Sequence, residues 1–389
     1  MNVARAAIPA ERIGVIAVVP DHWHDIWMPR HQVLHRLGRH FETVWVEPAL
    51  GWREYWLKGK GGAEVVQDVA PDFPGFHVYD PGRWLPEVHN PRWLGDVIRR
   101  RRLEQARRTL LAAGCSKIIL YLWRPEFDWA LDAVRADFTC YHIDDEYQFS
   151  TEDKPNDPRE VELIRRVDQV IIHSRKLFEK KGALNRNTVV VPNGVDYPAY
   201  STPQPEPADL ARIPHPRMGY VGVVKSQLDF GLLLELARRR PQWQLVLVGP
   251  RGHLGEKAAL LDELGTLGNV HLLGNRPVPS LPAYVQHMDT CLMCYEVSDY
   301  TNFIYPLKLH EYLATGRPVV ATPIDSVLPF GDVVQIAATV DAWEQALESS
   351  LEGAALHPNA IAARRRRAAE HDWEALVARI ANQFRSRLE

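Results

Sequence analysis

The chain has 389 residues, of which 46% are hydrophobic and 24% charged, and its formal net charge is −3. This composition is typical of a globular protein with two domains and argues against a disordered or fibrous chain. The charge gives no overall basic field that would attract nucleic acid, so we expect no nucleic-acid partner.

The first apolar run, Ile13 to Pro20, is far shorter than the roughly 20 residues that span a bilayer. It lacks a cleavage-site pattern and continues into the polar stretch Asp21 to Asp25. We therefore predict a buried first strand rather than a signal peptide, and a cytoplasmic location by default.

Further apolar runs in the first half alternate with amphipathic stretches, which favours a parallel sheet covered by helices. We predict a helix from about Pro29 to Arg39. The predicted strands are Ile13–Val19, Thr43–Val46, Lys117–Leu122, Phe138–Ile143, Gln169–His173 and Thr188–Val191.

A basic amphipathic stretch lies between the second and third of these strands. Arg99 to Arg102, Arg107 and Arg108 share a predicted helix with Trp93, and an aromatic and basic stretch around Trp52 precedes it. Such a helix binds anionic membranes in some proteins, whereas in others it is a solvated basic face. Both interpretations stay open from the sequence.

A proline-rich segment, residues 197–216, has no clean period, and we interpret it as a linker between domains 1–196 and 217–370. The alternation restarts after it. Predicted strands are Met218–Val221, Gln244–Val248, Val270–Leu273, Thr290–Cys294 and Pro318–Ala321, and predicted helices are Phe230–Arg239, Glu256–Leu264 and Leu307–Thr315. Residues 371–389 read as a final amphipathic helix.

The four cysteines are too few to form a disulfide framework in a chain of this length. Cys291 and Cys294 have C-x-x-C spacing, but neither a second pair nor histidines follow at zinc-ligand spacing. The surrounding segment is apolar and strand-like, so we predict buried structural thiols.

The segment PLKLHEYLATGRPVVAT, Pro306 to Thr322, carries the most chemical information. Proline at the start and Gly316 at the end mark the boundaries of a short helix. A helix N-terminus beside Lys308 suits a diphosphate, and Glu311 suits two ribose hydroxyls. An ordinary surface helix with a capping charge fits these residues equally well.

This segment resembles the nucleotide-sugar-binding helix of retaining GT-B glycosyltransferases related to glycosyltransferase family four (glycosyltransferase group 1). The subgroup concerned has the signature P-x-K-x-x-E-Y-L-A-x-G-[KR]-P-V-V. Further segments match the same subgroup in order and extend the resemblance over roughly residues 12 to 388: Pro29–Leu37, Val44–Pro48, Tyr141–Glu146, Val191–Asp196, Met218–Gly222, Leu247–Pro250, Val270–Gly274 and Asp372–Glu374.

The resemblance implies an α/β GT-B fold, with two Rossmann-like domains facing across a cleft and a C-terminal helix that crosses back to the first domain. It implies that Glu311 binds the donor ribose. The predicted donor-binding residues are Gly222, Lys225, Gly249, Arg276, Thr301, Asn302, Lys308 and Glu311.

Asp144 and Asp145 correspond to acidic residues that face the transferred sugar in relatives, and His24 lies in a loop bordering the cleft. We predict these three as catalytic candidates. A solvated acidic loop and a structural or solvated histidine are the alternatives. His173 is expected to be structural.

Two positions depart from the family pattern. Phe303 stands eight residues before Glu311, where many members have a glutamate, so Asp299, Thr301 or Asn302 is expected to contact the sugar. An arginine that usually follows the first glycine turn of the donor domain is absent, and Lys225 is its expected replacement.

The resemblance implies a glycosyltransferase that moves a sugar from a nucleotide-sugar donor to a glycan or lipid-linked acceptor of the cell envelope, with retention of configuration. We expect no cofactor and no metal, because protein cations can stabilise the leaving diphosphate. A UDP-sugar epimerase of the same fold and a non-catalytic nucleotide-sugar-binding protein are the alternatives.

Overall fold

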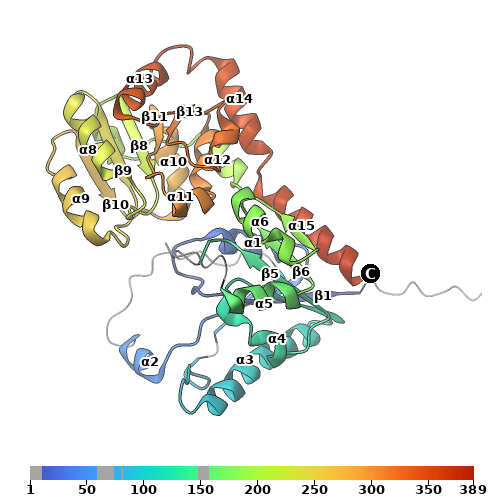
Figure 1. Ribbon diagram of the computed structural model, residues 1–389. Coiled ribbons are helices and arrows are strands. Elements are labelled where there is room, and N and C mark those ends of the chain that lie inside the picture. Colours follow the sequence, from blue (N-terminus) through green and yellow to red (C-terminus); the bar gives the residue numbers. More distant parts are fainter. Residues whose placement is uncertain (1–10, 59–73, 81, 148–156) are drawn as a thin grey trace, which may run out of the picture.

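The protein has two α/β domains, one above the other in Figure 1. This computed structural model describes residues 11–58, 74–80, 82–147 and 157–389. Within these residues, no helix combines the length and the apolar character needed to cross a membrane.

The first domain contains a seven-stranded parallel sheet in the order β3-β2-β1-β4-β5-β6-β7. Successive β1 residues are buried on opposite faces, Val15 and Ala17 in one cluster and Ile16 and Val18 in another, as expected for a sheet covered on both sides. Its strands are β1 (Ile13–Val18), β2 (Glu42–Val46), β3 (Phe76–Tyr79), β4 (Lys117–Leu122), β5 (Phe138–Ile143), β6 (Gln169–Ile172) and β7 (Thr188–Val190). Its helices are α1 (Pro29–Leu37), α2 (Trp52–Lys58), α3 (Arg92–Ala112), α4 (Ala130–Ala133), α5 (Pro158–Arg166) and α6 (Arg175–Lys181).

The second domain repeats this architecture with a six-stranded parallel sheet in the order β10-β9-β8-β11-β12-β13. Its strands are β8 (Arg217–Val221), β9 (Gln244–Val248), β10 (Val270–Gly274), β11 (Thr290–Met293), β12 (Val319–Ala321) and β13 (Gln335–Ile336). Its helices are α7 (Tyr197–Ser201), α8 (Phe230–Arg239), α9 (Ala258–Leu264), α10 (Leu281–Gln286), α11 (Asp299–Phe303), α12 (Leu307–Thr315), α13 (Val340–Ser350) and α14 (Pro358–Ala369).

The strand order reverses between β1 and β4 in the first sheet and between β8 and β11 in the second. Loops that leave the carboxyl ends of strands at such a reversal form a crevice in which ligands bind. The two crevices of this protein meet between the domains and position the candidate site.

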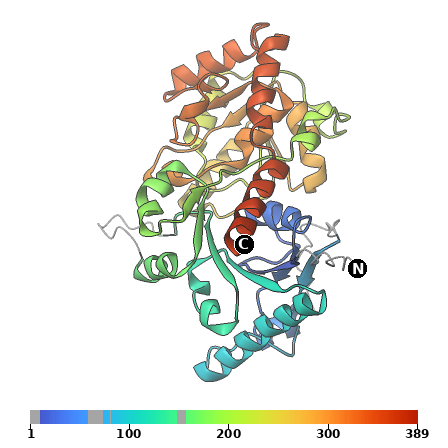
Figure 2. The same ribbon diagram turned by 90° about the vertical axis from the view of Figure 1, so that its right-hand side faces the viewer.

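The predicted C-terminal crossover is confirmed. Helix α15 (Trp373–Leu388) descends from the second domain onto the first, as Figure 2 shows, and Phe384 packs there against Phe41, Tyr121 and Phe138. At the crossing, the Trp373 N–H donates to the Val195 carbonyl and the Val195 N–H donates to the His371 carbonyl, both over 3.0 Å.

The segment interpreted as a linker, residues 197–216, is folded against the second domain. It contains helix α7 and a short 3₁₀ turn at Leu210–Arg212. Tyr200, Leu210 and Ile213 are buried in the second core, so this segment belongs physically to the domain that follows it.

The cysteine prediction is confirmed, because all four thiols are free and buried. The basic residues Arg99 to Arg102 of α3 do not share one environment, and Arg102 differs from the others. That side chain is buried, and its Nη2 donates to the Glu47 carbonyl over 2.6 Å because the helix turns this position toward the sheet. Arg99 pairs with Glu87, whereas Arg100 and Arg101 remain exposed.

Candidate functional site

A cavity of about 240 Å³ lies between the domains and is lined by both. From the first domain it is lined by Ile26, Trp27, Met28, Pro29, Asp144, Asp145, His173 and Asn193. From the second domain it includes Gly222, Lys225, Gly249, Arg276, Tyr300, Tyr305, Lys308 and Glu311. Eight of the eleven predicted site residues therefore share one cavity: Asp144, Asp145, Gly222, Lys225, Gly249, Arg276, Lys308 and Glu311.

Two glycine turns shape the floor of the cavity. Gly222 follows β8 and Gly249 follows β9, and both have a φ of 145°, which favours glycine. A Cβ on Gly222 would overlap the Lys308 side chain, and one on Gly249 would overlap the Gly222 carbonyl. The absence of a side chain at Gly222 therefore leaves room for Lys308 at the end of β8, and its absence at Gly249 lets the two turns lie against each other.

Lys308 and Glu311 project from helix α12, which begins after Pro306 and ends at Gly316 in the left-handed conformation, as predicted. Burial lowers the pKa of Lys308 to about 8, although Glu311 opposes the shift. Burial also raises the pKa of Glu311, while Lys308 and the Tyr200 hydroxyl, which donates to it, act the other way. A cation beside a helix N-terminus is suited to an anionic ligand such as a diphosphate.

Asp145 reaches the cavity from the loop after β5. The Tyr300 hydroxyl of the second domain donates to its Oδ2 over 3.3 Å, and Lys225 of the second domain is close enough to favour its charged form. Burial, followed by the neighbouring Asp144, nevertheless raises the pKa of Asp145 to about 6. This carboxyl can thus exchange a proton near neutral pH.

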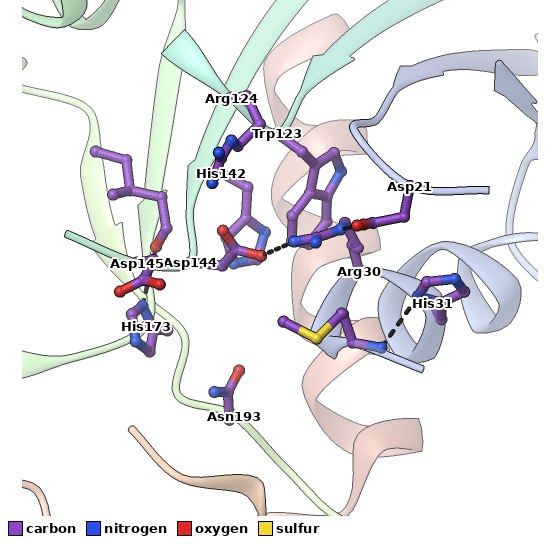
Figure 3. Close-up of polar contacts among 12 residues, drawn as sticks. Asp21, Arg30, His31, Trp123, Arg124, His142, Asp144, Asp145, His173 and Asn193 are labelled. Atoms are coloured by element: carbon purple, nitrogen blue, oxygen red, sulfur yellow. Dashed lines mark hydrogen bonds and ion pairs between the residues drawn. The ribbon is translucent and has the colours of Figure 1, made fainter. Parts of the chain in front are cut away.

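Asp144 has different partners. Arg30 of helix α1 donates to its Oδ2 over 2.5 Å, as Figure 3 shows. The Tyr147 hydroxyl donates to its Oδ1 over 2.6 Å. Arg30 also pairs with Asp21. Burial disfavours the charge on Arg30, but Asp144 and Asp21 outweigh it and raise the pKa of Arg30 above its usual value.

Three predicted site residues do not line the cavity. Thr301 is buried, and its hydroxyl donates to the Glu296 carbonyl over 2.6 Å at the start of α11. Asn302 accepts a hydrogen bond from the Asp325 N–H over 3.3 Å. His24 is exposed in the loop after β1.

Arg276 lines the cavity, and its guanidinium is hydrogen-bonded to two residues that do not line it. Its guanidinium donates to Asp209 over 2.6 Å and to the Tyr284 hydroxyl over 2.8 Å. Asp209 comes from the segment that we interpreted as a linker, so that segment orients a side chain of the cavity.

Phe303 occupies the position where many family members have a glutamate. The Lys180 Nζ of the first domain lies 5.3 Å from the centre of its ring. Phe303, which replaces the glutamate of the family pattern, therefore contacts the first domain. Asp299, an expected substitute for the glutamate, is exposed at the first position of α11.

Sequence reasoning missed several cavity residues. Tyr300 lies within α11 and Tyr305 follows it, neither in a motif of its own, and His173 was expected to be structural. Asn193 lies inside the matched segment Val191–Asp196, and its Nδ2 donates to the Tyr305 carbonyl over 2.7 Å. In the part of the chain that the structure describes, no group of three or more His, Cys, Asp or Glu side chains is arranged to hold a metal ion.

Comparison with known proteins bears on the second domain and on the fold. Residues 215–352 match the family model described as Glycosyl transferases group 1. A putative teichuronic acid biosynthesis glycosyltransferase, TuaH of Bacillus subtilis (strain 168), is 34% identical over 173 residues. The match covers 43% of this chain and 43% of TuaH, so the chain spans less than half the length of this curated relative.

Two solved structures match nearly the whole chain. HepE from Anabaena in complex with UDP has a TM-score of 0.65 at 16% identity, covering 96% of this chain and 100% of HepE. WaaG, a glycosyltransferase involved in lipopolysaccharide biosynthesis, has a TM-score of 0.59 at 14% identity, covering 95% of this chain and 98% of WaaG. The fold is GT-B, and the second domain carries the glycosyl transferases group 1 match.

Proposed function

We propose that the protein is a glycosyltransferase that moves a sugar from a nucleotide-sugar donor to a glycan or lipid-linked acceptor. The observation that carries this proposal is the meeting of Lys308 and Glu311 from the second domain with Asp145 from the first in one cavity. The group 1 match of the second domain and the UDP bound to HepE support a nucleotide-sugar donor.

The second-domain residues of the cavity suit the nucleotide and the leaving group of the donor. Negative charge develops on the departing diphosphate during glycosyl transfer, and Lys308, Lys225 and the N-terminus of α12 can stabilise it. Glu311 can accept hydrogen bonds from ribose hydroxyls. We propose that these cations make the reaction independent of metal and that configuration is retained, as the family resemblance implies.

The acceptor side of the cavity is partly apolar. Ile26 and Met28 are exposed, and with Trp27 they line the cavity after β1. This wall suits an acceptor with an apolar portion or the apolar face of a sugar ring. The name of TuaH supports a role in envelope polysaccharide synthesis.

We further propose that the enzyme acts at the inner face of a membrane. Trp52, Trp84 and Trp93 are 52%, 78% and 66% exposed, which is unusual for three tryptophans of one domain. Tryptophan is enriched at membrane interfaces, and basic side chains add attraction to anionic lipids.

The segments that carry these tryptophans are joined to one another. The Glu87 N–H donates to the Leu50 carbonyl over 2.9 Å, and Arg99 pairs with Glu87 over 2.6 Å. Figure 1 shows α2 and the first turns of α3 on the same side of the first domain. Arg100 and Arg101 are exposed on α3, and neither forms an ion pair with the described residues.

A donor screen tests the proposed activity. Thermal shifts with UDP-, GDP- and dTDP-sugars should identify a preferred donor, and acceptor-dependent release of its nucleoside diphosphate should follow and survive EDTA. Epimerised nucleotide sugar formed without any acceptor would support an epimerase instead. Tight donor binding without turnover on glycan or lipid-linked acceptors would support a binding protein, and loss of activity on chelation would contradict metal independence.

A further inference from the structure

His173 reaches the cavity from the first domain, although its place after a strand led us to expect a structural role. It follows the last residue of β6 and is only 2% exposed, yet it lines the cavity together with Asp145 and Asn193. Figure 3 shows these three side chains around the same open region.

The hydrogen bonding of the ring fixes its tautomer. The Nδ1 of His173 lies 3.0 Å from the Ile143 carbonyl oxygen, which can only accept, so Nδ1 carries the proton. In a neutral ring, Nε2 then presents a lone pair. Among the described residues, the one hydrogen bond of this imidazole is the bond to Ile143.

The surroundings keep the ring neutral. Burial lowers the pKa of His173, and the hydrogen bond to Ile143 and the charge of Asp144 oppose this shift without reversing it. Nε2 therefore remains a hydrogen-bond acceptor at neutral pH.

The position of the ring points to the donor side of the cleft. His173 lies edge to face with Tyr305, with the ring centres 6.4 Å apart. Tyr305 comes three residues before Lys308, and Asn193 holds its carbonyl. His173 thus stands beside the segment that leads into α12.

We propose that Nε2 of His173 accepts a hydrogen bond from a carbohydrate hydroxyl in the cleft, and that this carbohydrate is the glycosyl group of the donor. The proposal rests on the proposed function, since it assumes that a nucleotide sugar binds here. An acceptor hydroxyl is the other source of the same chemistry, and the experiment below separates the two.

Two substitutions test the donor at Nδ1 and the acceptor at Nε2 separately. His173→Asn keeps a donor near Nδ1 for the Ile143 carbonyl but removes the acceptor at Nε2, whereas His173→Gln places an amide oxygen near Nε2. Affinities are measured by calorimetry for the nucleotide sugar that wild-type protein binds best and for its parent nucleoside diphosphate. We expect His173→Asn to weaken nucleotide-sugar binding by about 3-fold to 10-fold, the range for one neutral hydrogen bond, with diphosphate affinity unchanged. His173→Gln should restore part of the loss.

His142 provides a matched control on the neighbouring strand. It is buried and stacked on Trp123 with ring centres 4.1 Å apart, and it does not line the cavity. His142→Asn should leave the ratio of the two affinities unchanged, even if it lowers stability.

Other outcomes would overturn all or part of the proposal. If His173→Asn leaves the ratio of nucleotide-sugar affinity to diphosphate affinity unchanged but raises the KM for the acceptor, His173 contacts the acceptor. That result would overturn the donor assignment. Unchanged donor and acceptor values in His173→Asn would overturn the proposal as a whole. Failure of wild-type protein to bind any nucleotide sugar would instead remove the proposed function, and this proposal with it.

Discussion

The adjacent carboxylates Asp144 and Asp145 differ because their neighbours differ. Asp144 accepts hydrogen bonds from Arg30 and Tyr147 and serves as a counterion for a buried guanidinium. Asp145 faces Lys225 and Tyr300 across the cleft, and its raised pKa suits proton exchange. Asp145 is therefore the better candidate for contact with the reacting groups, and Asp144 positions the loop that carries it.

The first prediction concerns Asp145. Its pKa of about 6, against an ordinary value of 3.8, means that the folded state binds this proton more tightly than the unfolded chain does. The free energy of unfolding therefore falls as pH rises between these values, and the penalty persists at higher pH. Asp145→Asn should raise the free energy of unfolding by up to about 3 kcal/mol near neutral pH but little near pH ~4.

The same variant should lower turnover by about 100-fold or more, the usual contribution of an acid or base. Asp262→Asn, at an exposed residue paired with Arg251, is the control for both measurements. Denaturant titrations at both pH values and steady-state rates provide the readouts. A variant that is neither more stable nor less active would remove Asp145 from the reaction centre.

The second prediction concerns Glu311. Glu311→Ala should weaken binding of the preferred nucleotide sugar by about 10-fold to 150-fold, because a hydrogen bond to a charged group contributes about 1.5–3 kcal/mol. Calorimetry gives the affinity. Glu344→Ala, on the surface helix α13, should bind normally. Equal affinity in a folded Glu311→Ala protein would exclude this residue from the donor site.

The sequence placed Lys308 and Glu311 on their helix more readily than it distinguished the surroundings of the acidic pair. Lys308 and Glu311 lie three residues apart on one short helix whose start and stop residues are local signals. The partner that distinguishes Asp144 from Asp145 is Arg30, which lies 114 positions away in the chain. Only the fold brings these side chains together, so the family resemblance could identify the acidic pair but not the different surroundings of its two carboxyl groups.

Helix α3 shows how one element can serve the core and the surface together. Leu103, Ala106 and Leu110 are buried against the sheet, while Trp93 and Val97, one turn apart, are exposed. Arg100 and Arg101 follow on the exposed side, with Arg102 turned inward. The apolar and basic parts of the outer face are therefore consecutive along the helix.

The third prediction tests this surface. Arg100→Gln with Arg101→Gln should weaken binding to anionic vesicles by about 2 kcal/mol, since each basic residue near such a surface contributes about 1 kcal/mol. Cosedimentation at low salt measures the change. Arg107→Gln with Arg108→Gln is the matched control on the same helix, because both arginines pair with Glu104. Wild-type protein that ignores these vesicles would contradict the proposal, and donor binding should be unaffected throughout.

Long buried strands were the elements most readily predicted. β1, β4 and β5 are mainly apolar runs of six residues that pair in the interior of the first sheet, so their signal is local. β3 and β13, with four and two residues at sheet edges, were not predicted, because they are too short to show a period. Their existence depends on the neighbouring strand that they pair with.

At the scale of the whole molecule, the two domains touch across the cavity. The contacts include Tyr300 with Asp145 and Asn193 with the Tyr305 carbonyl. Each joins a second-domain residue to the loops of the first. The two domains are therefore in contact across the cavity, and we expect that these contacts part when a substrate enters.

The fourth prediction follows from this closure. Tyr300→Phe removes the hydroxyl that reaches Asp145, so turnover should fall several-fold, while affinity for the nucleoside diphosphate stays within about twofold, because Lys308 and Glu311 lie in the second domain. Steady-state kinetics and calorimetry separate the two effects.

Small-angle scattering should show a more compact donor-bound enzyme. An open form trapped by a cross-cleft disulfide that still turned over normally would refute the closure mechanism.

The two crossings between the domains lie side by side, which makes the second domain an insertion in the first. Val195 and Asp372 pair as a β-bridge, a Cβ on Gly194 would overlap the His371 carbonyl, and Arg36 binds both Asp196 and Glu374. The ends of residues 197–371 thus leave and rejoin the first domain at neighbouring points. The second domain of a relative could therefore replace residues 197–371 without changing the distance between its two ends. Under the proposed function, donor preference and acceptor preference could then be exchanged between enzymes independently.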